Sequence, residues 1–407
     1  MIKIDSATEA LITSYLNADL SELALKGIPP FVLNQIEGRR AAKRKLPSWY
    51  ETKGIVYPGH LAMEQCSSEA TAKYKAVIAQ KLLGKLPHLP NKIVEITSGL
   101  GVDFLEVSKA IGGPEGSGCT YIEKDPELCR LAKVNLPLLG LPQAEILCQD
   151  GAEFILRSEE KWAVILADPS RRNSSGKRVY GIHDCSPDVT HLIPALVSKA
   201  YIAIIKLSPM LDPYQAIREL EASGKAKISE IHIVASGDEC KELLMVARSS
   251  ESVRDGQRKL YCACNEEVIE FPEEKSSEHL EVRLPSSWEG LYLYEPNPAI
   301  MKSGRFTDLE HLTGTRQIAP NSHLYLSEKC LGFPGRRFQI ERLCSLNKRE
   351  TRSMLDGVDS ANISVRNFHM SAEELRKRLR LKDGGEWFLF ATTTETGKGI
   401  IMLCKKL

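Results

Sequence analysis

Two glycines, Gly99 and Gly101, separate an apolar segment from a helical pattern that begins near Val102. Glycine permits a tight turn and lets a ligand approach the backbone closely, and the amino end of a helix favours anionic groups. A ligand site at this turn is therefore one interpretation, and a plain strand-to-helix turn is the other. A dinucleotide site needs a third small residue at position 104, where Phe104 stands, so NAD and FAD are disfavoured.

Acidic residues end the next three strand-like segments. Glu123 follows the second apolar segment, where a carboxylate can accept hydrogen bonds from both hydroxyls of a ribose. Asp150 follows the third segment, and Asp168-Pro169-Ser170 follows the fourth. Because the carboxyl ends of parallel strands meet at one edge of a sheet, we expect these side chains to surround one ligand.

The segments that position these residues alternate between short apolar runs and amphipathic helical runs from Lys92 to about Cys264. Repeated strand–helix units of this length predict a parallel, doubly wound α/β sheet. The N-terminal region is predicted to be helical, Glu266–Glu281 to be a charged linker, and the C-terminal part to be α+β. We therefore expect four parts, at residues 1–90, 91–265, 266–330 and 331–407.

Composition restricts the function classes. Hydrophobic residues make up 43% and charged residues 26% of the 407 residues, which excludes a wholly disordered chain. The net charge of +1 excludes a chain-wide basic coat for nucleic acid but permits local basic patches. No stretch approaches the ~18 apolar residues of a membrane span, and the 11 cysteines indicate reduced thiols. No cysteine pattern has zinc spacing. We expect a cytoplasmic protein with no metal and no membrane attachment.

The run from Glu95 to Asp103, with the pattern E-x-x-x-G-x-G-x-D, resembles motif I of class I S-adenosylmethionine-dependent methyltransferases. Glu123 resembles the next motif of that family, and Glu64-Gln-Cys-Ser-Ser68 resembles the E-Q-x-S/T element that precedes the sheet in several nucleic-acid methyltransferases. The resemblance implies a Rossmann-like, seven-stranded methyltransferase sheet with S-adenosylmethionine as cofactor. For the two serines of the second element, a helix N-cap is a further reading that is compatible with cofactor binding.

The same resemblance assigns parts of the cofactor to these positions. The position of Glu95 lies near the methionine part in such enzymes, that of Glu123 at the ribose, and that of Asp150 at the adenine amino group. The full set of expected cofactor-binding residues is Gln65, Ser67, Ser68, Glu95, Thr97, Gly99, Gly101, Asp103, Glu123, Asp150 and Asp168.

Asp168, Pro169 and Ser170 are the expected catalytic residues, because they resemble the D/N-P-P motif of nucleobase methyltransferases. Methyl transfer mainly requires a nucleophile held close to the methyl group and on its axis. An exocyclic amine of guanine or adenine can donate a hydrogen bond to Asp168, and Pro169 stiffens the loop. The aromatic residue that usually follows this motif is missing, and Tyr180 is a candidate replacement.

Methylation of carbon 5 of a pyrimidine is an alternative chemistry, and it needs a cysteine nucleophile near the fourth or fifth strand end. The fifth strand ends in Lys206-Leu-Ser-Pro209 without a cysteine. Cys240 follows the sixth strand, and Cys185, in a loop, stays a candidate. Lys206 is expected to be cationic and to contact the substrate or the Asp168 loop rather than to act as a base.

Further segments resemble a bacterial family of methyltransferases with a C-terminal THUMP-like domain. The matching segments include Asp168-Pro-Ser-Arg-Arg172, Tyr294-Glu-Pro-Asn297, Phe333-Pro-Gly-Arg336 and Val365-Arg-Asn-Phe368. The resemblance covers most of the chain beyond about residue 30, and it implies a small ferredoxin-like domain followed by a THUMP-like domain. Because THUMP domains bind tRNA in modification enzymes, it favours tRNA or rRNA as the partner.

Charge favours the same partner independently. Residues Phe333–Lys382 contain 12 Lys and Arg against 6 Asp and Glu, and Arg39–Lys45 is a second basic run. Such runs bind phosphates or are merely a solvated surface. The expected contacts to substrate or RNA are Arg171, Arg172, Lys206, Arg336, Arg337 and Arg366.

The favoured function is methylation of a base nitrogen in tRNA or rRNA. A small-molecule or protein methyltransferase and a non-catalytic RNA-binding relative are the alternatives. The intact glycine turn, Glu123 and Asp168 argue against the non-catalytic relative. The oligomeric state stays open.

Overall fold

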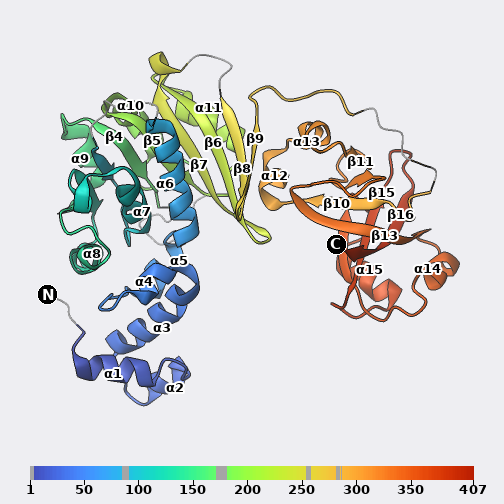
Figure 1. The fold of residues 1–407 in the computed structure, drawn as a ribbon, viewed down its shortest axis with the longest axis horizontal. Helices are drawn as coiled ribbons and strands as arrows, with labels where there is room; N and C mark the ends of the chain where they lie inside the picture. Colours follow the sequence, from blue (N-terminus) through green and yellow to red (C-terminus); the bar gives the residue numbers. More distant parts are fainter. Residues whose placement is uncertain (1–3, 85–90, 171–180, 254–257, 281–284, 286) are drawn as a thin grey trace. The chain divides into compact units, whose positions relative to one another are not determined.

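The computed structural model describes the chain except for residues 1–3, 85–90, 171–180, 254–257, 281–284 and 286. The chain forms two compact units (Figure 1). The first consists of Met1–Ile231 and Glu242–Asp255, and the second of His232–Lys241 and Gly256–Leu407. All residues of the predicted catalytic and cofactor site belong to the first unit.

The first unit begins with helices and continues with alternating strands and helices. The helices are α1 (Ser6–Ser14), α2 (Leu20–Leu25), α3 (Pro30–Lys45), α4 (Pro47–Glu51), α5 (His60–Gln65) and α6 (Glu69–Leu83). The alternating part is β1 (Ile93–Glu95), α7 (Val102–Ile111), β2 (Cys119–Glu123), α8 (Pro126–Leu138), β3 (Glu145–Cys148), α9 (Gly151–Arg157), β4 (Trp162–Ala167), α10 (Val189–Lys199), β5 (Ala200–Leu207), α11 (Pro213–Glu221), β6 (Ala226–Ser236) and β7 (Glu239–Ser249). Residues 232–241, in β6 and β7, belong to the second unit.

The large sheet places the predicted site at one edge. Strands β3-β2-β1-β4-β5 are parallel neighbours in that order, and β7 pairs antiparallel with β5. The full hydrogen-bonded order is β3-β2-β1-β4-β5-β7-β6-β8-β9. Chain order reverses between β1 and β4, and the carboxyl ends of strands at such a switch point are where open α/β sheets bind ligands.

Aspartate caps fix where the helices after the strands begin. Helices α8, α9, α10 and α11 each follow an aspartate whose carboxylate accepts hydrogen bonds from backbone N–H groups of the first turn. Such a cap stabilises a helix by about 1 kcal/mol. The connections before α8, α9 and α11 are short, whereas the connection before α10 runs from residue 168 to residue 188. The cap of α9 is Asp150, one of the predicted cofactor residues.

Two buried amides attach the N-terminal helices to the rest of the first unit. The side chain of Gln35, in α3, exchanges two hydrogen bonds with the backbone of Tyr57. The side chain of Asn135, in α8, does the same with the backbone of Val56. Both amides are buried, so the segment between α4 and α5 is held from two sides. This attachment places α5 and α6, which carry Gln65–Ser68, at the sheet.

The second unit contains a seven-stranded sheet of order β11-β12-β10-β13-β16-β15-β14. The second unit is built from β8 (Lys259–Cys264), β9 (Glu267–Phe271), β10 (Tyr292–Pro296), α12 (Pro298–Ser303), α13 (Phe306–Thr313), β11 (Arg316–Gln317), β12 (Tyr325–Ser327), β13 (Gly335–Ser345), α14 (Lys348–Met354), β14 (Asn362–Arg366), α15 (Ala372–Leu379), β15 (Trp387–Thr393) and β16 (Gly399–Lys406). Of these strands, β8 and β9 belong to the large sheet. Alternate residues of β16 enter two different cores, which explains its continuous apolar sequence.

The predicted α/β sheet is confirmed, although the large sheet has nine hydrogen-bonded strands in the described residues where seven are expected. The predicted linker Glu266–Glu281 is wrong in part, because Glu267–Phe271 forms β9, antiparallel to β8. Phe271 is buried, and this apolar contact outweighs the acidic composition of the segment. Strands on both sides of residue 330 share one sheet, since β10 pairs with β13. The four-part domain division stays a prediction.

Replacement of Asn135 by alanine tests the attachment of the N-terminal helices. The variant leaves the buried N–H and C=O groups of Val56 without partners, so the free energy of unfolding should fall by about 2–4 kcal/mol. Urea unfolding of Asn135→Ala measures the loss, and Asn91→Ala, at an exposed position, is the matched control. Equal stability of both variants would refute the role of the amide.

Candidate active site

The glycine turn after β1 lies against the end of β2. The N–H of Gly99 donates a hydrogen bond to Oε2 of Glu123 (2.9 Å). Gly101 has a φ of 86°, and a Cβ there would stand 3.2 Å from the Tyr121 ring, so position 101 requires glycine. Gly99 has a φ of 56°, and no atom lies within 4 Å of where its Cβ would be. The turn therefore leaves free space beside the Glu123 carboxylate.

Asp168 lies at the end of β4, beside Lys206 near the end of β5. Ala167 pairs with Ile205, so the next residues of the two strands are neighbours. Lys206 Nζ is 2.6 Å from Asp168 Oδ2. The backbone N–H of Asp168 donates a hydrogen bond to Oγ1 of Thr97 (2.6 Å), which fixes this strand end next to β1. The predicted contact of Lys206 with the Asp168 loop is thus present.

Behind this pair lies a group of buried charges. Lys75, in α6, has its Nζ 2.9 Å from Oδ1 of Asp103 and 2.7 Å from Oε2 of Glu242. The Ser67 hydroxyl lies 2.7 Å from Oδ2 of Asp103 and 3.0 Å from Oε1 of Glu242. Lys206 Nζ is 3.9 Å from the same Oε1. We call Lys75, Asp103, Asp168, Lys206 and Glu242 the buried ion cluster.

Mutual attraction opposes the effect of burial on the charges of Lys75 and Asp103. Burial opposes the charge of Lys75, but Asp103 and Glu242 together raise its pKa. Burial likewise opposes the charge of Asp103, but Lys75 and Lys206 lower its pKa. For Asp168, burial raises the pKa more than Lys206 lowers it. A buried charge without a partner would cost several kcal/mol, so each member depends on the others.

Glu95, at the end of β1, adjoins the cluster without a cation bound to it. Its side chain is 2% exposed, and no group in the described part of the chain hydrogen-bonds its Oε2. Burial, followed by the charges of Asp103 and Asp168, raises the pKa of this carboxyl well above its ordinary value. Glu95 lines a cavity of ≈ 10 Å³ together with Lys75, Asp103, Asp168 and Lys206. That volume holds about one water molecule.

The charges around this cavity do not cancel. The two lysines face the three carboxylates of Asp103, Asp168 and Glu242, without counting Glu95, whose pKa is raised by burial. The site therefore carries an excess negative charge in a buried environment, where charges interact strongly. A cationic group would compensate it.

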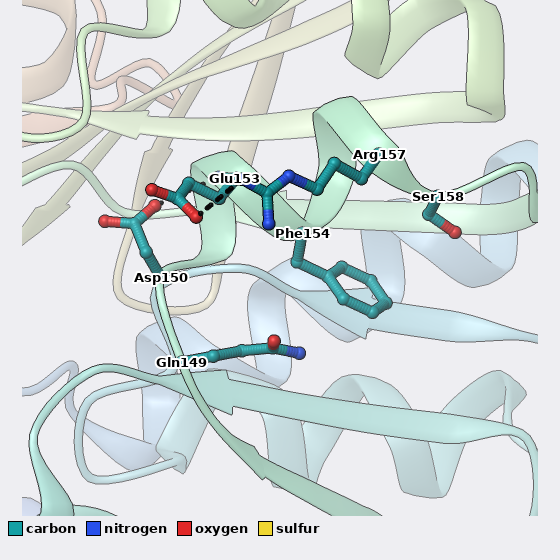
Figure 2. Close-up of a pocket in the computed structure, with 6 residues that line it drawn as sticks. All are labelled: Gln149, Asp150, Glu153, Phe154, Arg157 and Ser158. Carbon is teal, nitrogen blue, oxygen red and sulfur yellow. Dashed lines mark hydrogen bonds and ion pairs between the residues drawn. The ribbon is translucent and has the colours of Figure 1, made fainter.

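A larger hollow of ≈ 250 Å³ runs along α9 and contains none of the predicted catalytic residues. Figure 2 shows Gln149 and Asp150 at its sheet end and the Phe154 ring between them and the end of the helix. Oδ1 of Asp150 accepts hydrogen bonds from Ala152 and Glu153 N–H. The predicted adenine ligand is thus a helix cap with an exposed carboxylate.

The segment Gln65–Ser68 divides between two environments. Ser67 joins the buried ion cluster, whereas Gln65, the last residue of α5, is exposed. Ser68 accepts a hydrogen bond from Thr71 N–H and caps α6, which confirms the N-cap reading. Lys45 Nζ donates to the carbonyls of Met63 and Glu64 and so fixes this end of α5.

The predicted catalytic loop is described as far as residue 170. Pro169 is buried and Ser170 exposed, and the backbone of Ser170 exchanges hydrogen bonds of 2.8 and 3.0 Å with Ser186. Arg171, Arg172 and Tyr180 lie outside the described residues. Cys185 is buried, with its Sγ 3.5 Å from the Gly181 carbonyl. Cys240, in the second unit, contacts the Pro298 carbonyl through its Sγ, and burial raises its pKa.

The predicted RNA contacts of the second unit are partly engaged within the protein. Arg336 and Arg366 both pair with the buried carboxylate of Glu295, whereas Arg337 is exposed. The two arginines come from β13 and β14, so the ion pairs tie separate strands of one sheet together. Each arginine side chain remains 37% exposed.

Most of the basic run in α3 is also engaged. Arg39 pairs with Glu9, Arg40 donates to carbonyls of the α1–α2 connection, and Lys45 holds α5. Lys43 and Arg44 are exposed. Three of the five basic residues of Arg39–Lys45 are therefore held within the protein, which weakens the interpretation of this run as an RNA-facing patch.

Sequence reasoning missed Lys75 and Glu242. Lys75 lies among Ala72, Ala76, Ile78 and Ala79 on the buried face of α6, and a lysine among such residues is a usable signal for a buried partner. Glu242 opens the apolar run of β7 and gives no comparable signal, because charged residues commonly begin strands. The described residues contain neither a cluster of metal-ligating side chains nor a helix long and apolar enough to cross a membrane.

Comparison with known proteins identifies the family. A ferredoxin-like domain model matches residues 292–334, and a THUMP-domain-like model matches residues 335–406. The chain is 30% identical to an inferred methyltransferase from Porphyromonas gingivalis W83, over 98% of this chain and 97% of that one, with a TM-score of 0.78. The chain belongs to this family of class I methyltransferases with a C-terminal THUMP-like domain. This methyltransferase is an enzyme that uses S-adenosylmethionine.

Two more distant solved structures match less than half of this chain. The S-adenosylmethionine-dependent methyltransferase of Agrobacterium tumefaciens is 18% identical over 43% of this chain and 62% of its own, with a TM-score of 0.32. TrmN of Thermus thermophilus is 16% identical over 44% of this chain and 52% of its own, with a TM-score of 0.29. No curated protein matches this chain.

The residues present fit the cofactor. S-adenosylmethionine carries an ammonium, a sulfonium and one carboxylate, so it is a net cation, and the methyltransferase offers a buried, unpartnered Glu95 oxygen beside an excess of negative charge. The free space at Gly99 adjoins the Glu123 carboxylate, whose chemistry suits hydroxyl groups. These two features lie at neighbouring strand ends, β1 and β2.

Glu95→Gln tests the protonation of this buried carboxyl. Because its pKa in the folded protein is raised, Glu95 stabilises the fold least at high pH. Wild type should match the variant below about pH 4.5 and become less stable as pH rises, by ~1.4 kcal/mol per unit of pKa elevation. Urea unfolding at about pH 4.5 and pH 8 measures the difference.

Glu69→Gln is the control with the opposite sign. Burial opposes the ionisation of Glu69, but Lys73 and the N–H of Ser48 lower its pKa overall. Its ionised form therefore stabilises the fold, and Glu69→Gln should lose stability relative to wild type as pH rises. A Glu95→Gln variant that behaves in the same direction as this control would show that Glu95 is ionised.

Proposed function

We propose that this methyltransferase transfers a methyl group to a base nitrogen of tRNA or rRNA. The observation that carries the proposal is the binding and exposure of the Asp168 side chain. Its Oδ2 is bound by Lys206, and the side chain is still 35% exposed, so the carboxylate is accessible to an incoming amine. A carboxylate beside a proline-stiffened loop suits the positioning of an exocyclic amine.

S-adenosylmethionine, held by the residues named in the next paragraph, would supply an electrophilic methyl group to the amine nitrogen, and the electron pair of the broken C–S bond would remain on sulfur. Asp168 orients the amine by accepting a hydrogen bond and takes the proton that the product nitrogen loses. Burial, which raises the pKa of Asp168, makes it a better proton acceptor than a solvated carboxylate. Pro169 and the Ser170 carbonyl restrict the directions from which the base can reach Asp168.

The cofactor-binding residues are proposed on the same basis. Glu95 faces the ammonium, Glu123 accepts hydrogen bonds from the ribose hydroxyls, and the exposed Asp150 carboxylate receives the adenine amino group. Gln65 closes over the methionine end. Thr97, Asp103 and Ser67 act through Asp168 and Lys75 rather than by direct contact, because their polar atoms are already engaged.

RNA is proposed as the substrate because of the THUMP-like segment and its exposed basic side chains. Arg378, Arg380 and Lys382, at and after the end of α15, are exposed. Arg376 and Lys377 of the same helix pair with Asp383 and Glu373. Lys377 is exposed as well, so what favours Arg378, Arg380 and Lys382 for contact with phosphates is that no carboxylate in the described part of the chain forms an ion pair with them.

Methyl transfer to RNA in vitro tests the proposal. The methyltransferase is incubated with S-adenosylmethionine labelled in its methyl group and with total RNA from a strain that lacks its gene. Label in a modified base of one RNA species is expected. Label only in proteins or small molecules would show that RNA is not the substrate. Absence of cofactor binding by calorimetry would favour a non-catalytic role.

Asp168→Ala should abolish transfer, with a loss of at least about 100-fold in kcat. Cofactor binding, measured by calorimetry, should change little, because the other proposed ligands remain. Asp188→Ala, which removes a helix cap of the same unit, is the control. Loss of cofactor binding in Asp168→Ala would show that Asp168 holds the cofactor instead.

Replacing Arg378, Arg380 and Lys382 by alanine should weaken RNA binding similarly for all sequences. Each lost phosphate contact lowers the slope of log K against log salt by about 1. The control replaces Arg376 and Lys377, which are paired within the protein. Equal salt slopes for wild type and the triple variant would remove this surface from the RNA interface.

A further inference from the structure

Lys206 stands between two carboxylates, and only one of them belongs to the expected catalytic loop. Its Nζ lies 2.6 Å from Asp168 Oδ2 and 3.9 Å from Glu242 Oε1. The pairing of β5 with β7 places Lys206 opposite Leu244, so Glu242 is the diagonal neighbour on the same face of the sheet. A small rotation of the lysine side chain is enough to exchange one acceptor for the other.

An incoming amine competes with Lys206 for Asp168. As long as the ammonium occupies Oδ2, it lowers the basicity of the carboxylate and repels a nitrogen that becomes cationic during methyl transfer. Removal of Lys206 into solvent is disfavoured, because its side chain is only 15% exposed. The ammonium therefore needs a second buried acceptor.

Glu242 can receive it without leaving another group unpaired. The Ser67 hydroxyl has one proton and two acceptors, Asp103 Oδ2 at 2.7 Å and Glu242 Oε1 at 3.0 Å. If Ser67 donates to Asp103, Oε1 of Glu242 is available to Lys206. Lys75 stays bound to Asp103 and to Oε2 of Glu242 in both arrangements.

We propose that Glu242 is a positioning residue that receives the Lys206 ammonium when a substrate amine reaches Asp168. Lys206 thus binds one oxygen of Asp168 in the resting protein and leaves it for the reaction. The buried ion cluster is bistable in the sense required of a switch, since the Lys206 ammonium has a carboxylate partner in both arrangements and the substrate amine takes its place on Asp168. The kinetic consequence rests on the proposed methylation of a base nitrogen, whereas the exchange of acceptors rests on the geometry alone.

A crystal structure of the Asp168→Asn variant tests the exchange without a substrate. Loss of the Asp168 charge should move Lys206 Nζ from 3.9 Å to about 3 Å from Glu242 Oε1. The Ser67 hydroxyl should then keep only Asp103 as its acceptor. A Lys206 that stays on the substituted side chain, or turns to solvent, would overturn the proposal.

Kinetics of Glu242→Gln test its consequence for the reaction. Lys206 should remain on Asp168, so kcat should fall by about 10-fold or more with little change in KM for RNA. The acid limb of the pH profile of kcat should shift to lower pH, because a retained ammonium lowers the pKa of Asp168. Glu242→Asp, which keeps the charge, should recover part of the activity.

Glu69→Gln, which neutralises a buried carboxylate of α6 outside the cluster, controls for stability. A purely structural role of Glu242 predicts that Glu242→Gln lowers the folded fraction but leaves the acid limb and the kcat per folded molecule unchanged, and this result would contradict the proposal. If wild type methylates no RNA, the proposed function fails, and the crystal structure of Asp168→Asn still decides the exchange.

Discussion

Buried charges must be paired, and this requirement governs the arrangement of the first unit. Lys75 lies in α6, Asp103 in α7, and Glu242 in β7, yet the three side chains meet within hydrogen-bond distance. Leaving any one without a partner would cost several kcal/mol. The cluster thus fixes α6 and α7 against the sheet at the carboxyl ends of β1, β4 and β5, where the predicted site lies.

The same buried charges also bear on the binding of the cofactor. Three carboxylates and two lysines leave an excess negative charge, and burial raises the pKa of the adjoining Glu95 carboxyl. A cofactor with a sulfonium and an ammonium relieves this imbalance. Lys206 connects the cluster to Asp168, so the group proposed to orient the acceptor amine belongs to the network that holds the fold together.

The sequence predicts the sheet and the strand-end residues well, because both depend on local patterns. The glycine turn, Glu123, Asp150 and Asp168 follow directly from apolar runs and turn chemistry. Glu242 could not be predicted, because its partners Lys75 and Ser67 lie 167 and 175 positions earlier in the chain. Arg336 and Arg366 appeared as RNA contacts, whereas Glu295 holds both, a pairing that only the folded sheet reveals.

The central claim is that Asp168 orients a base nitrogen of an RNA for methylation. Mass spectrometry of nucleosides from a gene-deletion strain, complemented with wild type or with Asp168→Ala, tests it most directly. The account predicts one N-methylated nucleoside that is absent from the deletion strain, restored by wild type, and not restored by the variant. Identical nucleoside profiles in all strains, or restoration by Asp168→Ala, would contradict it.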